Sequence, residues 1–463
     1  MFPDRLTRRT FMSRSAAAAA GLFLSSCFGE KVATTPTPRP TFGKPVETID
    51  TRWPIDRVVY LMLENRSFDN LFGRFPGVDG ATTGVRLGQE VPLIHCPEWL
   101  PGDLPHDLIS WEACYRDGQL DGFANGEWGP YYAYSQFGRA DIPNYYHWAK
   151  EFVIGDHFFA SQAGPSYANH LFLIAGQAGG AIDNPENILT KRLNDGRIFK
   201  SWGCDAFGED VFVYTREKDG DLTKHPSCFD FDTVGEQLTR RDIDWAFYSA
   251  DPYQAGYIWQ AYSAVKDVFH DRDLWDEHIW PVDDLMRDIE ANALPPVTWI
   301  TPRFQLSDHP PFSTKHAHNW VTDIVNGLMR SEMWNSLALF ITWDEWGGLY
   351  DHVKPPKIDD GELGFRVPLL VISPFAKRGY VDDALGEFSA PLRFIADNWG
   401  LPYLTKRIRS SHSFEHVFDF DGRPRPPDPQ PHVRATNRFW DWPEHFPGWP
   451  AGITPEEPTI RYP

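Results

Sequence analysis

The sequence contains few cysteines and little positive charge. Its 463 residues include five Cys, and no two of them form a Cys-x-x-Cys pair, which argues against a thiolate zinc site. Lys and Arg number 44 against 64 Asp and Glu, so the net charge is −20. No stretch resembles the basic stripe that neutralises phosphates, so nucleic acid is not an expected partner.

Long hydrophobic runs are also missing near the N-terminus. The apolar stretch 15–24 follows the twin arginines Arg8 and Arg9 and is too short for a stable membrane span. This arrangement is typical of a twin-arginine export signal. The stretch ends in Leu-Ser-Ser-Cys at Cys27, which looks like a bacterial lipobox. We therefore predict that residues 1–27 are a twin-arginine lipoprotein signal. The alternative is an ordinary signal peptide with a chance cysteine.

Residues 28–52 are rich in Thr and Pro and predict a solvated, semi-extended tether. Lipidated at Cys27, the chain would be an exported lipoprotein held at a membrane, periplasmic or on the cell surface. The remaining four cysteines would then meet an oxidising compartment, so two disulfides are expected. Three pairings are open, and we predict the local ones. They join Cys96 to Cys114 and Cys204 to Cys228.

Short strand-like and helix-like segments alternate along the rest of the chain, and hydrophobic residues make up 42% of it, enough for a large core. The predicted strands are 58–63, 244–249, 297–301, 337–342 and 369–373. The predicted helices are 142–152, 318–333 and 390–399. Such alternation predicts an α/β fold with a mainly parallel sheet flanked by helices.

We expect one catalytic domain over residues 53–463, since no internal repeat is found. Residues 184–232 break the alternation of strands and helices and carry two cysteines, which predicts an inserted cap segment. From 421–463 the chain is rich in Pro, Trp and Arg without periodicity, which predicts an extended C-terminal tail.

An acid and an amide follow directly on the first predicted strand. Glu64 and Asn65 come immediately after the run 58–63, and α/β sheets carry their sites at the carboxyl ends of parallel strands. A carboxylate and a neutral carbonyl oxygen suit a hard or borderline divalent cation. The pair therefore predicts a cation site.

A second pair of acids follows another predicted strand. Asp344 and Glu345 come just after the run 337–342, and adjacent carboxylates repel each other unless a cation or proton neutralises them. Gly347 and Gly348 allow the backbone to approach closely at this point. An isolated Asp-Glu pair is more often two solvated loop acids, but its place at a second strand end favours cation ligands.

A serine stands at a Gly-Pro turn just before an apolar, helix-like run. Ser166 occupies the position of either a helix cap or a nucleophile at a helix N-terminus, where a nearby anion is stabilised. The residues alone leave both roles open.

Together these segments resemble a known family. The motifs are Glu-Asn-Arg-Ser-Phe-Asp (64–69), Gly-Pro-Ser-x-x-Asn (164–169) and Asp-Glu-x-Gly-Gly-x-Tyr-Asp-His-Val (344–353). In this order they look like the bacterial phosphoesterase family, which includes phospholipases C and a class of acid phosphatases. The resemblance runs from about residue 57 to 420. It implies an alkaline-phosphatase-like α/β fold that hydrolyses phosphate esters.

The resemblance also implies roles for individual residues. It makes Ser166 the nucleophile and assigns the remaining roles to two sets of side chains. The metal ligands would be Glu64, Asn65, Asp344 and Glu345, and the phosphate-binding or proton-handling residues would be His106, His309 and His352. The cofactor would be a divalent metal ion, calcium or zinc. The implied partner is a phosphate-ester substrate, with phospholipids among the candidates.

Three positions depart from the family pattern. Phospholipase-like members commonly have Thr where this chain has Ser166, whereas acid-phosphatase-like relatives have Ser. Arg is common where His170 stands, and His is common near Glu387, so the number of metal ligands is open.

The leading prediction is a phospholipase C-like phosphoesterase, with an acid phosphatase of phosphomonoesters as an alternative. A rival hypothesis is a binding lipoprotein that captures phosphorylated or choline-type ligands without cleavage. Its aromatic wall would consist of Trp111, Trp128, Trp343 and Trp346. A glycosidase is a weaker third hypothesis, because neighbouring Asp344 and Glu345 project differently from two facing carboxyls.

Overall fold

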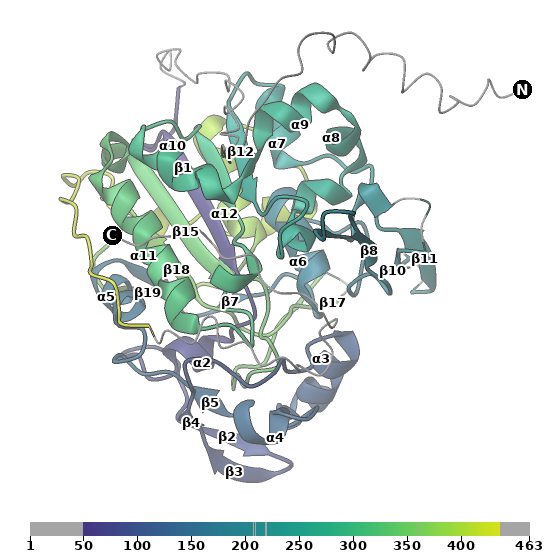
Figure 1. The fold of residues 1–463 in the computed structure, drawn as a ribbon. Helices are drawn as coiled ribbons and strands as arrows, with labels where there is room; N and C mark the ends of the chain where they lie inside the picture. The colour runs from purple at the N-terminus through teal and green to yellow at the C-terminus, as the bar shows by residue number, and fades with distance from the viewer. Residues whose placement is uncertain (1–49, 207, 209, 218–219, 360, 436–463) are drawn as a thin grey trace, which may run out of the picture. The chain divides into compact units, whose positions relative to one another are not determined.

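An eight-stranded sheet forms the centre of the protein in the computed structural model, which describes residues 50–435 apart from 207, 209, 218–219 and 360 (Figure 1). The export signal, Cys27 and all but the last residues of the predicted tether lie outside the described residues. Within the described part of the chain, no helix combines the length and apolar composition needed to cross a membrane.

The strand order in this sheet is β13-β12-β14-β1-β15-β18-β6-β19. The bounds are β1 Arg57–Leu63, β6 Val153–Gly155, β12 Trp245–Ser249, β13 Ile279–Pro281, β14 Val297–Ile300, β15 Leu337–Trp343, β18 Leu369–Ile372 and β19 Tyr380–Asp382. Only β18 runs against its two neighbours, β15 and β6. The predicted α/β class with a mainly parallel sheet is confirmed.

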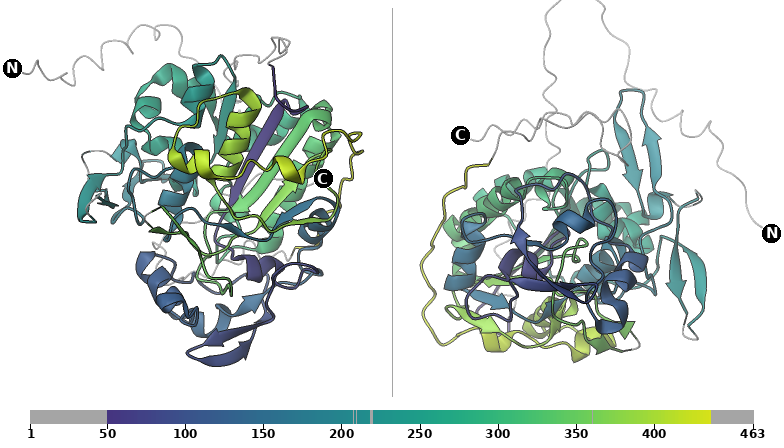
Figure 2. Two further views of the ribbon diagram at one scale, coloured as in Figure 1. Left: turned by 180° about the vertical axis from the view of Figure 1, so that it is seen from behind. Right: turned by 90° about the horizontal axis from the view of Figure 1, so that it is seen from below.

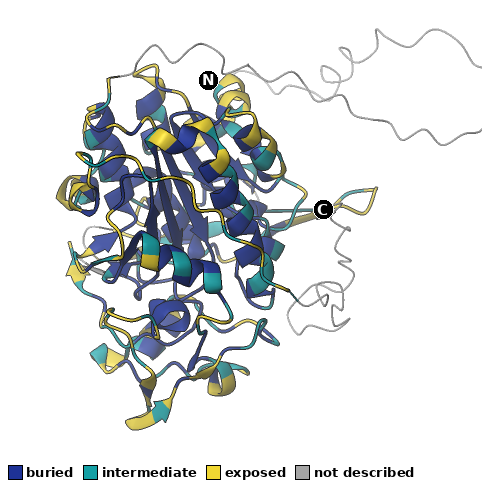
Figure 3. Cartoon of the chain, turned by 90° about the vertical axis from the view of Figure 1, so that its left-hand side faces the viewer, coloured by how far each residue is buried: buried dark blue, intermediate teal, exposed yellow. Residues whose placement is uncertain are grey.

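Helices cover both faces of the sheet. Figure 1 shows α10 (Leu285–Glu290) and α11 (Thr314–Arg330) over one face, and the view from behind in Figure 2 shows α12 (Ser389–Trp399) over the other. Covered on both sides, the central strands consist mainly of buried apolar residues, and Figure 3 shows them in dark blue. The three predicted helices are confirmed as α5 (Pro143–Glu151), α11 and α12.

The register of the two central strands positions the site. β1 and β15 are parallel neighbours, and Leu63 pairs with Trp343 at their carboxyl ends. All seven residues of β15 are buried, so its register is fixed by the core on both faces. The acids that follow, Glu64 and Asp344, consequently leave the sheet side by side.

A group of short elements lies at the end of the sheet where β1 leads into α2 (Phe68–Phe72) (Figure 1). It contains the hairpin of β2 (Thr83–Arg86) and β3 (Gln89–Pro92) and the pair of β4 (Ile94–His95) and β5 (Ser135–Gln136). Two helices, α3 (Leu108–Tyr115) and α4 (Gly129–Tyr132), complete it. The loop between β4 and α3 reaches the site described below.

The segment 184–232 folds into two hairpins. They pair β8 (Leu189–Arg192) with β9 (Ile198–Ser201) and β10 (Phe212–Arg216) with β11 (Leu222–Pro226). A disulfide between Cys204 and Cys228 closes part of this segment, which confirms that pairing.

The other predicted disulfide is wrong, because Cys96 and Cys114 are both buried free thiols. They belong to separately anchored segments. The Cys96 N–H donates to the carbonyl of Gln136 in β5, whereas Cys114 lies in α3 with its Sγ 3.7 Å from the Asn125 amide.

The described part of the tail, 421–435, contains no helix or strand and runs along α5 and α11. Side-chain amides of these helices donate to its backbone carbonyls, from Asn144 to Pro431 and from Asn326 to Gln430. These side-chain hydrogen bonds hold a segment that forms no helix or strand.

Candidate active site

The site begins where β1 and β15 end together. The Glu64 N–H donates to the carbonyl of Ser307, and the Asn65 N–H donates to Asp344 Oδ1, each at 2.8 Å. The backbone of Asn65 adopts the left-handed conformation, with φ of 62°. A Cβ on Gly347 would lie 2.4 Å from the Asn65 carbonyl oxygen, so this turn requires glycine there.

A histidine joins the two acids. His170 Nε2 lies 2.9 Å from Glu64 Oε1 and 3.9 Å from Asp344 Oδ2, and one ligand atom from each residue lies within 4.8 Å of the others. All three side chains are buried. Burial lowers the pKa of His170 to about 4, so its ring is neutral and able to ligate. Family resemblance pointed to Arg here and gave no role to His170.

Several oxygens at this point are buried without a hydrogen-bond partner. They are Glu64 Oε2, Asn65 Oδ1, Asp344 Oδ2 and Glu345 Oε1. Burial, followed by the charge of Asp344, raises the pKa of Glu64 well above its usual value, and burial also raises that of Glu345. Buried acceptors without donors are rare in folded proteins. Four carboxylate or amide oxygens with one imidazole form a donor set that fits a divalent cation.

Ser166 is the first residue of α6 (Ser166–Ala175) and is buried. The N-cap position is Pro165, so Ser166 is not the capping residue. Its side chain lies near the Glu64 carboxyl, where it acts to lower the pKa of Glu64 against the larger effect of burial. Asn169 shapes the turn, because its amide donates to the carbonyl of Pro165 at 3.1 Å and its oxygen accepts from the Gln162 N–H at 3.0 Å. His170 follows Ser166 by four residues and therefore shares its helix face.

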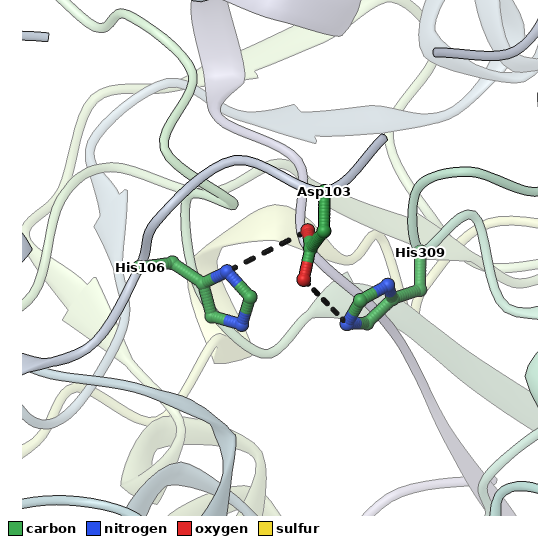
Figure 4. A group of neighbouring side chains, drawn as sticks. All are labelled: Asp103, His106 and His309. Atoms are coloured by element: carbon green, nitrogen blue, oxygen red, sulfur yellow. Dashed lines mark ion pairs between the residues drawn. The ribbon is translucent and has the colours of Figure 1, made fainter. Parts of the chain in front are cut away.

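Two of the predicted histidines lie beside this centre. His106 comes from the loop between β4 and α3, and His309 from the loop before α11. Their rings approach edge to face with centroids 5.6 Å apart. Burial alone would lower the pKa of His106, but the charges of Asp103 and Glu345 raise it to about 9, whereas burial lowers that of His309. Figure 4 shows Asp103 between the two rings.

The third predicted histidine lies in another cluster. His352 Nδ1 is 2.6 Å from Asp69 Oδ2, and its Nε2 is 3.0 Å from Asp79 Oδ1. The buried Arg366 guanidinium pairs with Asp69 and Asp351 in the same cluster. In the described part of the chain, the hydrogen bonds and ion pairs of His352 are with Asp69 and Asp79, so the structure does not bring it to the strand-end acids.

Other candidates from the sequence are structural. Glu387 accepts hydrogen bonds from the Ser161 and Ser411 hydroxyls and the Ser389 N–H, so its carboxylate is engaged away from the acids. Trp343 and Trp346, proposed for an aromatic wall, are fully buried in the core.

Comparison with known proteins decides the family. Residues 55–402 match the Phosphoesterase family. The chain belongs to the phosphoesterase family. This membership confirms the predicted enzyme class, a phosphoric ester hydrolase.

Curated relatives of this phosphoesterase are phospholipases C. The Hemolytic phospholipase C of Pseudomonas aeruginosa is 24% identical, over 99% of this chain and 70% of the relative. The Phospholipase C B of Mycobacterium tuberculosis is 26% identical, over 92% of this chain and 88% of the relative.

Solved structures show weaker likenesses. Human ectonucleotide pyrophosphatase / phosphodiesterase 5 is 10% identical with a TM-score of 0.37, covering 78% of this chain and all of that one. A protein in the alkaline phosphatase superfamily from Vibrio parahaemolyticus is 10% identical with a TM-score of 0.35, over 83% of this chain and 75% of that one. These scores carry no argument, and the α/β class rests on the sheet described above.

Proposed function

We propose that this phosphoesterase hydrolyses phosphate esters through Ser166 with the assistance of a divalent cation. One observation carries the proposal. Ser166 is the buried first residue of α6 and acts on the pKa of Glu64, and Glu64 Oε2 is one of the buried oxygens that lack hydrogen-bond donors. A nucleophile at a helix N-terminus beside such a group is suited to attack at phosphorus.

Glu64, Asn65, Asp344 and His170 would hold the cation, with Glu345 as a further oxygen donor. Bound there, it would offset the negative charge of the phosphoryl oxygens and favour the ionised serine. Oxygen donors with one imidazole are compatible with calcium or zinc.

The residues of the chain account for the movement of protons. The Ser166 Oγ–H bond breaks as Oγ bonds to phosphorus, and the proton passes to water. The P–O bond to the leaving alcohol breaks, and His106, which is cationic at neutral pH, protonates that oxygen. Water then cleaves the phosphoserine ester and restores the Ser166 hydroxyl.

The substrate we propose is a phospholipid or related phosphodiester, since the curated relatives are named phospholipases C. Ser166 in place of the more common Thr favours phosphomonoesters as a second candidate. An exported lipoprotein anchored through Cys27 would meet phospholipids at the membrane. A panel of phosphatidylcholine, a soluble phosphodiester and a phosphomonoester, each assayed with and without chelator, separates these substrates.

Ser166→Ala tests the nucleophile. The variant should fold normally and lose turnover of a chromogenic phosphoester by several orders of magnitude. Ser410→Ala, at the exposed end of α13 (Lys406–Ser410), is the matched control and should retain full activity. Turnover by Ser166→Ala equal to that of wild type would exclude the serine mechanism.

A further inference from the structure

A single exposed carboxylate lies between the two histidines of the site. Asp103 Oδ1 is 3.7 Å from His106 Nδ1, and Asp103 Oδ2 is 3.9 Å from His309 Nε2 (Figure 4). The Asp103 side chain is 43% exposed, whereas those of His106 and His309 are 13% and 10% exposed. Among the described residues, its ion pairs are with these two histidines alone. Because its side chain is so exposed to water, packing in the core does not explain why Asp103 lies between the two histidines.

Both rings are oriented by the backbone. His106 Nδ1 lies 2.6 Å from the carbonyl oxygen of Leu104, and His309 Nδ1 lies 2.5 Å from that of Pro310. A carbonyl can only accept, so each Nδ1 carries a hydrogen and each Nε2 is the nitrogen left for a proton or a ligand. Neither Nε2 is among the buried atoms without partners. The carboxylate of Asp103 therefore faces the hydrogen-bearing Nδ1 of His106 on one side and the Nε2 of His309 on the other.

The charges around the pair differ for the two rings. His106 faces Asp103, Glu345 and Asp344, and all three favour its cation. His309 faces Asp103 and Asp344 but also the positive His106, and the ring of Phe304 packs 4.7 Å from it. A cation held by Asp344 and Glu345 would remove their contribution to His106. The contribution of Asp103 would remain, because Asp103 lies outside that donor set.

We propose that Asp103 is a positioning residue of this site, whose carboxylate holds one positive charge on the His106 and His309 pair and directs it to His106. His106 is then the group that gives a proton to the leaving alcohol, while neutral His309 offers its Nε2 as a hydrogen-bond acceptor. The inference rests on the proposed phosphoesterase function and adds a residue to it. Enzymes commonly separate acid from base by giving two similar groups different surroundings.

The direct test is a histidine ring titration by NMR in the Ser166→Ala background, with the full chain and ring-labelled histidine. His106→Gln assigns the resonance. Asp103→Asn should lower the titration midpoint of His106 by about one pH unit or more, as expected on removing an opposite charge at this distance. Asp103→Glu should restore most of it. Asp117→Asn, at an exposed acid in η1 (Arg116–Gly118), is the control and should leave it unchanged.

Activity gives the second readout. In the Ser166 enzyme, Asp103→Asn should move the basic limb of the pH profile of kcat/KM to lower pH by the same amount, because that limb reports the essential acid. A His106 midpoint that Asp103→Asn leaves unchanged overturns the proposal. A shifted midpoint together with active Ser166→Ala would instead uphold Asp103 and refute the serine mechanism, so the two failures are distinguishable.

Discussion

Asp344→Asn is the substitution that separates a cation site from an ordinary buried acid cluster. The asparagine keeps the size of the side chain and an oxygen that can accept from the Asn65 N–H. It removes one negative charge next to Glu64 and supplies an N–H donor on the side facing His170. Without a cation, the change should therefore stabilise the protein.

The magnitude follows from the geometry. Carboxylate oxygens of Glu64 and Asp344 lie within 4.8 Å of each other, and two charges at that separation repel by about 3 kcal/mol at an effective dielectric constant of about 20. Burial raises the pKa of Glu64 and Asp344 raises it further, so protonation of Glu64 relieves part of the repulsion as the pH falls through that raised pKa. The gain in unfolding free energy should approach about 3 kcal/mol only at alkaline pH.

Urea unfolding at pH 9, with chelator or with excess calcium or zinc, measures both effects. Wild type should be stabilised by at least one of these cations, as expected for a ligand that binds only the folded state. Asp344→Asn should be more stable than wild type in chelator and respond less to the cation. Glu290→Gln, at the exposed end of α10, is the control. Destabilisation of Asp344→Asn in chelator, with wild type unaffected by either cation, would refute the reasoning.

Two further predictions concern stability. Burial alone would lower the pKa of His352, but its hydrogen bond and charge interaction with Asp69 raise it to about 9. Its contribution is fully present below the unfolded value of about 6.5 and is lost as pH rises through about 9, so His352→Gln should cost up to about 3 kcal/mol at pH 6 and little at pH 10. Equal costs at both pH values in urea unfolding would contradict this. Cys204 and Cys228 are 24 residues apart, so replacing both with Ser should destabilise by about 3 kcal/mol through restored chain entropy. Unchanged protease resistance of the 184–232 segment would argue against that effect.

Sequence patterns identified Glu64 and Asp344 as site residues because only the positions of two strands are needed to place them. The runs before Glu64 and Asp344 are continuously apolar, as strands buried on both faces must be, and carboxyl ends of parallel strands meet at one edge. The two patterns together predict that Glu64 and Asp344 lie close to each other, and the prediction does not depend on the conformation of any loop.

The remaining groups depend on loops and packing. His170 could have been found from its spacing of four residues after Ser166, but family resemblance directed attention to arginine there. Asp103 and His309 meet only because separate loops converge, and no local pattern records that. The family resemblance makes His352 a site residue, since it belongs to the motif over residues 344–353. Beyond Gly347 and Gly348, however, the chain carries it to Asp69 and Asp79.

In the fold as well, some elements can be predicted from the sequence and others depend on long-range packing. Long apolar runs predicted β1, β12, β14, β15 and β18, whereas β6, β13 and β19 have three residues each and are too short to stand out. The reversal of β18 and the absence of a bond between Cys96 and Cys114 depend on long-range packing. Sequence spacing carries no signal for either.

The stereochemical course at phosphorus tests the central claim most directly. A chiral phosphorothioate diester hydrolysed in isotopically labelled water reports whether phosphorus is attacked once or twice. Attack by Ser166 followed by attack of water consists of two in-line displacements, so the account predicts net retention of configuration. Net inversion would show that water attacks the ester directly and would contradict a serine nucleophile.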